Sequence, residues 1–112
     1  MPTIRQNKIG KLLQKELGDI LDKNSRALAP GKLITVTTVR VTPDLGLAKV
    51  YLSIFPTQEN EKALATIEHN AKTIRHDLGT RVRHQLRIIP ELQFFIDDSL
   101  DYVEKIDNLL KS

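Results

Sequence analysis

A chain of 112 residues is long enough to bury one hydrophobic core and too short for two, so we expect a single domain over residues 1–112. With 40% hydrophobic and 28% charged residues the composition is that of a globular protein, and the absence of Cys excludes a disulfide framework, thiol chemistry and Cys-ligated zinc. The sequence contains neither an apolar run of transmembrane length nor a secretory signal pattern, which leads us to expect a soluble cytoplasmic protein.

The N-terminal part of the chain predicts a helix followed by a loop. Apolar residues recur at helical spacing from Ile4 to about Lys23, although Gly10 and Gly18 each weaken the helix by up to about 1 kcal/mol. The Ala-Pro-Gly run at 29–31 is typical of a helix end, so residues 24–32 are expected to form a loop.

The next two segments predict an antiparallel β-hairpin. Leu33 to Val41 is rich in β-branched residues, and a shift in its alternation indicates a β-bulge near Thr37 and Thr38. Turn-forming residues at 43–46 lead into a second run, Ala48 to Ile54, in which apolar and polar residues alternate.

A long helical pattern follows, from Glu59 to about Leu86. Pro90 prevents the helix from continuing farther. Nearly thirty helical residues without a break are unusual in so small a domain, so we expect a kink. The candidates are residues 70–73 and Gly79, and we favour the first because a break there would direct free backbone N–H groups at a phosphate.

The C-terminal part predicts one more strand and one more helix. Leu92 to Ile96 alternates as a strand, in which Phe94 and Phe95 point to opposite faces, one of them toward the core. Residues 97–99 fit the cap of a last helix that runs to about Leu110. The predicted class is therefore α+β, in the order helix, strand, strand, two helices, strand, helix.

Basic residues are concentrated in one window of the sequence. Residues 70–88 carry a formal charge of +4, whereas the whole chain carries +3. The five basic residues of this window are Lys72, Arg75, Arg81, Arg83 and Arg87, against the single acid Asp77. A concentrated basic helix is the electrostatic pattern of a protein that binds phosphates.

The two ends of the chain differ in sign. Residues 1–15 contain four basic residues and no acid, whereas residues 91–107 contain six acids and one base. This asymmetry indicates a basic face toward a polyanion and an acidic face behind it. A solvated helix, or pairing of these charges across the fold, would explain the pattern without a ligand, but the scarcity of acids within residues 70–88 favours the phosphate interpretation.

No set of residues typical of a catalytic site is found, so we expect no enzymatic activity and no cofactor. His69 and His76 lie two helical turns apart, about 10 Å, which is too far for both to bind one metal ion. Asp97 and Asp98 fit a helix cap better than a general acid–base pair. The lack of a glycine-rich phosphate loop argues against nucleotide hydrolysis.

The predicted order of elements is that of the type II KH fold, which commonly binds single-stranded RNA, but the GXXG loop of KH domains is missing. Several stretches, in order over most of the chain, carry a more specific signal: Thr35-Val36-Thr37, Asp44-Leu45, Ala48-Lys49-Val50-Tyr51, Ile74-Arg75 with Leu78, and the run from Leu86 to Phe95 that continues into Asp97-Asp98-Ser99-Leu100. Together these stretches resemble the ribosome-binding factor A family of bacterial small-subunit maturation factors.

The resemblance implies a KH-like domain in which a helix-kink-helix element replaces the GXXG loop. The kink corresponds to Ala71-Lys72-Thr73, where the family often has Ala-x-Gly and this chain has threonine. Members of the family bind the free small ribosomal subunit, help its rRNA to mature at the 5′ end and the decoding region, and matter most in the cold. An assembly GTPase is a further partner suggested by the same analogy.

We therefore predict a monomeric, non-enzymatic rRNA-binding assembly factor. Its predicted phosphate-contacting residues are Lys72, Arg75, Arg81, Arg83 and Arg87, extended by Lys8 and Lys11. Two alternatives stay open: a binder of DNA or unrelated RNA that uses the helix pair in a helix-turn-helix manner, and a protein adaptor that uses the acidic C-terminal helix.

Overall fold

Four helices and three strands make up residues 3–97, the part of the chain that this computed structural model describes. They are α1 (Ile4–Lys23), α2 (Ser25–Leu28), β1 (Leu33–Val41), β2 (Leu47–Phe55), α3 (Asn60–His69), α4 (Ala71–Val82) and β3 (Glu91–Ile96). This order confirms the predicted α+β class and the predicted succession of major elements. The predicted C-terminal helix lies outside the described residues.

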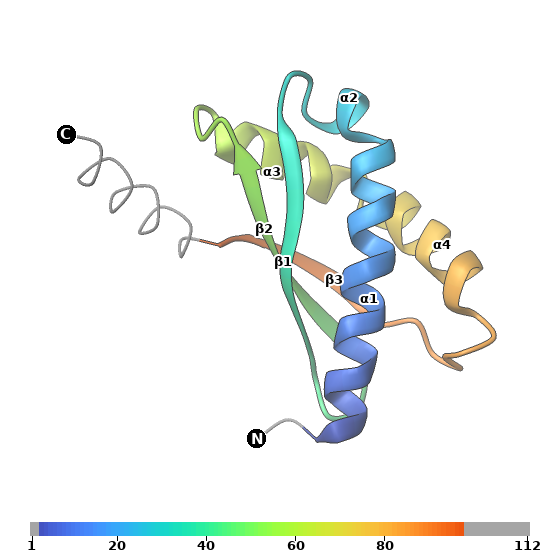
Figure 1. The fold of residues 1–112 in the computed structure, drawn as a ribbon. Helices are drawn as coiled ribbons and strands as arrows, with labels where there is room; N and C mark the ends of the chain where they lie inside the picture. Colours follow the sequence, from blue (N-terminus) through green and yellow to red (C-terminus); the bar gives the residue numbers. More distant parts are fainter. Residues whose placement is uncertain (1–2, 98–112) are drawn as a thin grey trace.

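The three strands form one sheet in the order β1-β2-β3, with β1 antiparallel and β3 parallel to β2 (Figure 1). The pairing shifts register between Val36 and Thr38, which confirms the predicted bulge. Residues such as Val50 and Leu52 are buried, whereas their neighbour Lys49 is exposed. Helices α1, α3 and α4 cover one face of the sheet, and no element of residues 3–97 covers the other, which we call the open face.

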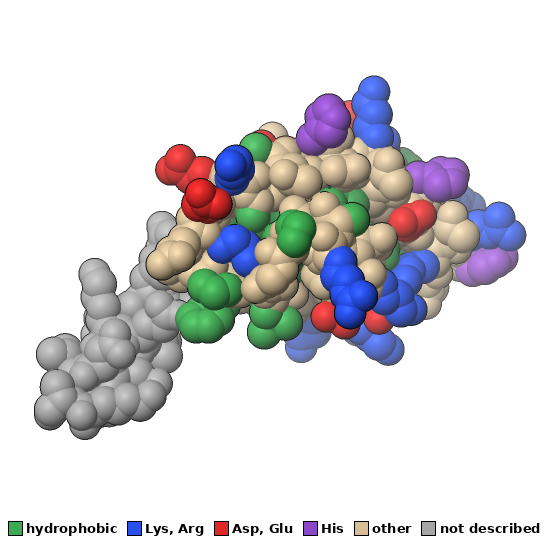
Figure 2. Space-filling model, turned by 90° about the horizontal axis from the view of Figure 1, so that it is seen from above, with side chains coloured by type: hydrophobic (Ala, Val, Ile, Leu, Met, Phe, Trp, Pro, Cys, Tyr) green, Lys and Arg blue, Asp and Glu red, His purple; other side chains and the backbone are tan. Residues whose placement is uncertain are grey.

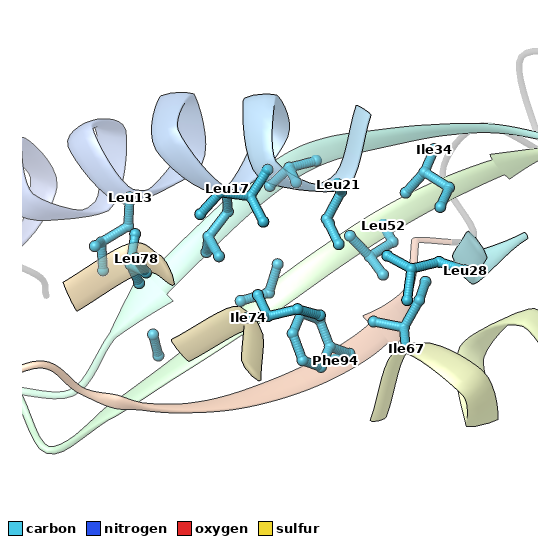
Figure 3. Close-up of a cluster of buried hydrophobic side chains, with 14 of the residues drawn as sticks. Leu13, Leu17, Leu21, Leu28, Ile34, Leu52, Ile67, Ile74, Leu78 and Phe94 are labelled. Atoms are coloured by element: carbon cyan, nitrogen blue, oxygen red, sulfur yellow. The ribbon is translucent and has the colours of Figure 1, made fainter. Parts of the chain in front are cut away.

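The core lies between that helical layer and the sheet. Figure 3 shows Leu13, Leu17 and Leu21 of α1 directed toward side chains from α3, α4 and the strands. All three leucines are fully buried, and each such burial contributes roughly 1.5–3 kcal/mol. The helical spacing that predicted α1 from sequence is thus the spacing of its buried face.

Helix α1 also covers the outer edge of β1. The side-chain amide of Gln6 donates to the carbonyl of Val41 at 2.9 Å, and that of Gln14 donates to the carbonyl of Thr37 at 3.1 Å. Between them lies Gly10, where an added Cβ would meet the Val39 carbonyl oxygen at 2.8 Å. The glycine therefore permits the close approach that lets both glutamines bond to an edge that would otherwise be unpaired.

The long helical pattern is broken at Asn70, within the range that we favoured, and Gly79 lies inside α4. Asn70 has φ −97° and ψ 11°, and its side-chain amide donates to the Thr66 carbonyl at 2.8 Å. The kink thus falls one residue before the Ala71-Lys72-Thr73 triplet implied by the resemblance, and that triplet forms the first turn of α4. Asparagine accepts this bridge-region geometry more readily than a β-branched residue such as threonine.

Two predicted boundaries were wrong. Residues 25–28 form a one-turn helix where a loop was predicted, because this turn buries Leu28, which is 6% exposed, in the hydrophobic core. Helix α4 ends at Val82, before the predicted Leu86, because the chain turns back there along α4. Of the two adjacent phenylalanines, Phe94 is in the core and Phe95 is on the open face.

Candidate nucleic-acid interface

The basic window forms α4 and the segment 83–90 that connects it to β3. The apolar residues Ile74, Leu78 and Val82 of α4 are buried, so the charged residues between them are left at the flanks of the helix. Segment 83–90 folds back on α4, and Ile89 lies against Gly79. This return brings residues that are far apart in the basic window onto one surface.

A groove of about 630 Å³ lies between α4 and the returning segment. Its lining residues are Lys72, Arg75, His76, Gly79, Thr80, Arg83 and Ile89. Three of these seven residues are cationic and none is acidic, which favours an anionic ligand. The sequence predicted the cations, but Gly79 and Ile89 could not be assigned to the site because no local pattern indicates that the chain turns back.

Arg75 holds the groove in shape. Its Nη2 donates to the Ile89 carbonyl at 2.7 Å and its Nε donates to the Pro90 carbonyl at 3.1 Å. The guanidinium fork therefore fastens the returning segment to α4 through two backbone carbonyls. Arg75 thus lines the groove, but two of its N–H groups already donate to acceptors within the protein.

Arg81 faces away from the groove, toward α1. Its Nη1 lies 2.6 Å from Asp19 Oδ2 and 3.3 Å from Glu16 Oε2. The hydrogen bond from Arg81, followed by one from Lys23, holds the pKa of Asp19 below its ordinary value, and the bond to Asp19 raises the pKa of Arg81. The pairing of charges across the fold that the sequence left open therefore applies to Arg81.

Lys72, Arg83 and Arg87 remain as the outward cations of the window. All three are exposed, and none forms an ion pair with another residue of the described range 3–97. Figure 2 shows Lys, Arg and His side chains gathered at the end of the molecule where α4 lies. We refer to Lys72, Arg83 and Arg87 as the outer cations.

The start of α4 adds a second feature suited to an anion. Asn70 precedes the helix but makes no side-chain cap, because its amide is bonded backward to Thr66, and the first turn contains no acidic residue. The N–H groups of this first turn and the side chain of Lys72 thus lie together at the positive end of the helix dipole.

The two α1 residues predicted to extend the patch differ in position. Lys8 lines a second cleft with Arg5 on one side and Gln85 and Leu86 of the returning segment on the other. It therefore lies beside residues 85 and 86, which directly precede Arg87 in the sequence. Lys11 is exposed one helical turn farther along α1.

Among residues 3–97, no group of three or more His, Cys, Asp or Glu side chains is placed to hold a metal ion. Over the same residues, no helix combines the length and the apolar character that crossing a bilayer requires.

The family model and two similar curated proteins that match this chain carry the same family name. The family model described as Ribosome-binding factor A matches residues 5–110 of the chain. A protein of Flavobacterium psychrophilum named Ribosome-binding factor A is 53% identical over 98% of this chain and 85% of its own length, and a protein of the same name from Flavobacterium johnsoniae is 54% identical with the same coverage.

Solved structures agree on the fold. The crystal structure of ribosome-binding factor A from Thermus thermophilus has a TM-score of 0.70 at 24% identity, covering 81% of this chain and 94% of that one. A second T. thermophilus structure, a homology model of ribosome binding factor A fitted into a cryo-EM map of its complex with 30S, has a TM-score of 0.60 at 29% identity, covering 78% and 93%. The three-stranded sheet backed by helices is thus a KH-like fold with a helix-kink-helix element.

Proposed function

Because this chain belongs to the ribosome-binding factor A family, we propose that it binds the small ribosomal subunit as a non-enzymatic assembly factor, using α4 and the segment 83–90. The observation that carries this proposal is the set of outer cations beside a groove without acids. Its T. thermophilus relative, known from a complex with 30S, supports the choice of partner.

The residues of the basic window take two roles in this proposal. The rRNA phosphates are contacted by the outer cations, Lys72, Arg83 and Arg87, and at the margin of the patch by Lys8 and Lys11. Arg75 and Arg81 act as positioning residues, because their guanidinium groups already bind backbone carbonyls and the carboxylates of α1. Cations that are exposed and unpaired gain more from a phosphate than cations that must first leave an internal partner.

The finer function follows the family. We propose that residues 1–112 act as one domain on the free small subunit in the cytoplasm, as a monomer, and assist late maturation of the rRNA at its 5′ end and decoding region, chiefly in the cold. An assembly GTPase is the proposed additional partner. The helix-turn-helix alternative is less well supported, because a single residue separates α3 from α4, whereas a helix-turn-helix places a turn of three or four residues there.

A complementation experiment tests the proposal. In cells that lack this protein, we expect small-subunit rRNA with immature 5′ ends to accumulate at low temperature, as measured by primer extension. Wild-type protein and the control variant Arg26→Ala, altered at an exposed residue of α2, should restore mature 5′ ends, whereas Lys72→Ala/Arg83→Ala/Arg87→Ala should not. Restoration by the triple variant, produced at wild-type level, would refute the assignment of the outer cations.

A further inference from the structure

The face of the sheet opposite the helices carries chemistry that the proposed function does not use. Cross-strand register places Arg40, Lys49 and Gln93 in one row and Thr38, Tyr51 and Phe95 in the next. Adjacent rows on one face are two residues apart, about 6.6 Å along a strand. A row with two cations therefore lies beside a row with two aromatic rings.

The aromatic row offers a flat surface for stacking. The rings of Tyr51 and Phe95 are stacked, with centroids 5.4 Å apart and planes inclined by 26°. Phe95 is 37% exposed although its neighbour Phe94 is buried. An exposed ring held in place by a second ring is a rigid platform for an unpaired base, since every base has an apolar face that stacks on aromatic side chains.

The cationic row indicates the charge of the ligand. Arg40 and Lys49 are directly opposite each other on antiparallel strands, where two like charges destabilise the pairing. Both are exposed, and within residues 3–97 neither forms an ion pair. A bound anion between or above them would relieve this repulsion. The nearest described carboxylates of this face, Glu91 and Asp97, lie beyond the two rows, and Asp97 accepts a hydrogen bond from Thr37.

We propose that this open face is a second nucleic-acid surface, which takes single-stranded RNA by stacking a base on Phe95 and holding the flanking phosphate with Arg40 and Lys49. It lies on the opposite side of the sheet from α4, so one RNA-binding domain would contact two separated strands of a folding rRNA. The inference does not require that the outer cations act as proposed above, because a short oligonucleotide can occupy one face alone.

The test measures binding of a fluorescein-labelled 12-nucleotide oligouridine by fluorescence anisotropy across a salt series. Phe95→Leu keeps an apolar side chain, and we expect it to weaken binding about tenfold without changing the salt slope. Arg40→Gln/Lys49→Gln is expected to weaken binding and to reduce the slope of log K against log[salt] by about 1.4. The control Arg26→Gln/Lys62→Gln removes the same charge from exposed residues of α2 and α3.

Each outcome separates this inference from the proposed function. Variants of the open face that bind like the Arg26/Lys62 control would overturn the inference, even if the triple variant of the outer cations has lost affinity. A measurement on unmodified protein adds a second criterion: photocrosslinking to 4-thiouridine RNA should label peptides that contain Tyr51 or Phe95. Crosslinks confined to residues 72–87 would also overturn it.

Discussion

Removing the three outer cations should lower the salt dependence of rRNA binding by an amount set by the number of phosphates that they neutralise. If Lys72, Arg83 and Arg87 each neutralise one phosphate, each contributes about 0.7 to the slope for a single strand and about 0.9 for a duplex. The triple alanine variant should therefore have a slope smaller by about 2 to 3. Between 50 and 200 mM salt, wild-type affinity should fall roughly 20- to 40-fold more than that of the variant.

The assay is the equilibrium affinity for purified small subunits, measured by anisotropy of labelled protein at five or more salt concentrations. Because the three side chains are exposed, the free energy of unfolding should stay within about 0.5 kcal/mol of wild type for each substitution. A triple variant with the wild-type slope would refute the reasoning, since affinity would then depend on contacts other than these phosphates.

Substitution of Arg75, unlike that of the outer cations, should reduce the stability of the fold. Arg75→Ala removes two charge-assisted hydrogen bonds, to the carbonyls of Ile89 and Pro90, and is expected to lower the free energy of unfolding by about 1–2 kcal/mol after allowance for the partial exposure of the guanidinium. Arg75→Lys, which keeps the charge but not the fork, should recover only part of this stability. Urea denaturation that gives wild-type stability for Arg75→Ala would show that Arg75 is not a positioning residue.

Two further predictions concern α1. The pKa of Asp19 is lowered in the folded state, so its bond to Arg81 stabilises the protein at pH values above the ordinary pKa of 3.8 and loses that effect as the pH falls below it. The unfolding free energies of wild type and Asp19→Asn should therefore differ at pH 7 and converge toward pH 3. A difference that is independent of pH would contradict the ion pair. Gly10→Ala should lower the free energy of unfolding by about 1–3 kcal/mol, because the new Cβ would meet the Val39 carbonyl oxygen at 2.8 Å. Gly18→Ala, which has open space at its position, should raise it by up to about 1 kcal/mol. Thermal denaturation measures both, and equal effects would refute the close approach of α1 to β1.

Local patterns were sufficient for most of the fold. The buried face of α1, the hairpin with its bulge at 36–38 and the break near Asn70 all follow from residues close together in sequence, whose spacing and propensity dominate their conformation. The end of α4 did not follow, because it depends on the return of segment 83–90, which Arg75 fastens from 14 and 15 residues away.

The candidate site likewise combines features that the local sequence predicts with features that depend on tertiary packing. The charge of the basic window was evident from composition, but the internal hydrogen bonds and ion pairs of Arg75 and Arg81 were not. Arg81 meets Asp19 across 62 residues of sequence, and only the packing of α1 beside α4 brings them together. The exposure of Phe95 likewise required the position of the strand in the sheet, since the alternation of Phe94 and Phe95 is symmetric until one face is known to be covered.

The central claim is that this protein acts on the free small subunit, and sucrose-gradient sedimentation of a cell lysate tests it most directly. Immunoblotting across the gradient should find the protein with free small subunits and not with whole ribosomes, and the triple variant of the outer cations should move to the top of the gradient. Recovery of the wild-type protein only at the top, under conditions in which immature subunits accumulate, would contradict the claim.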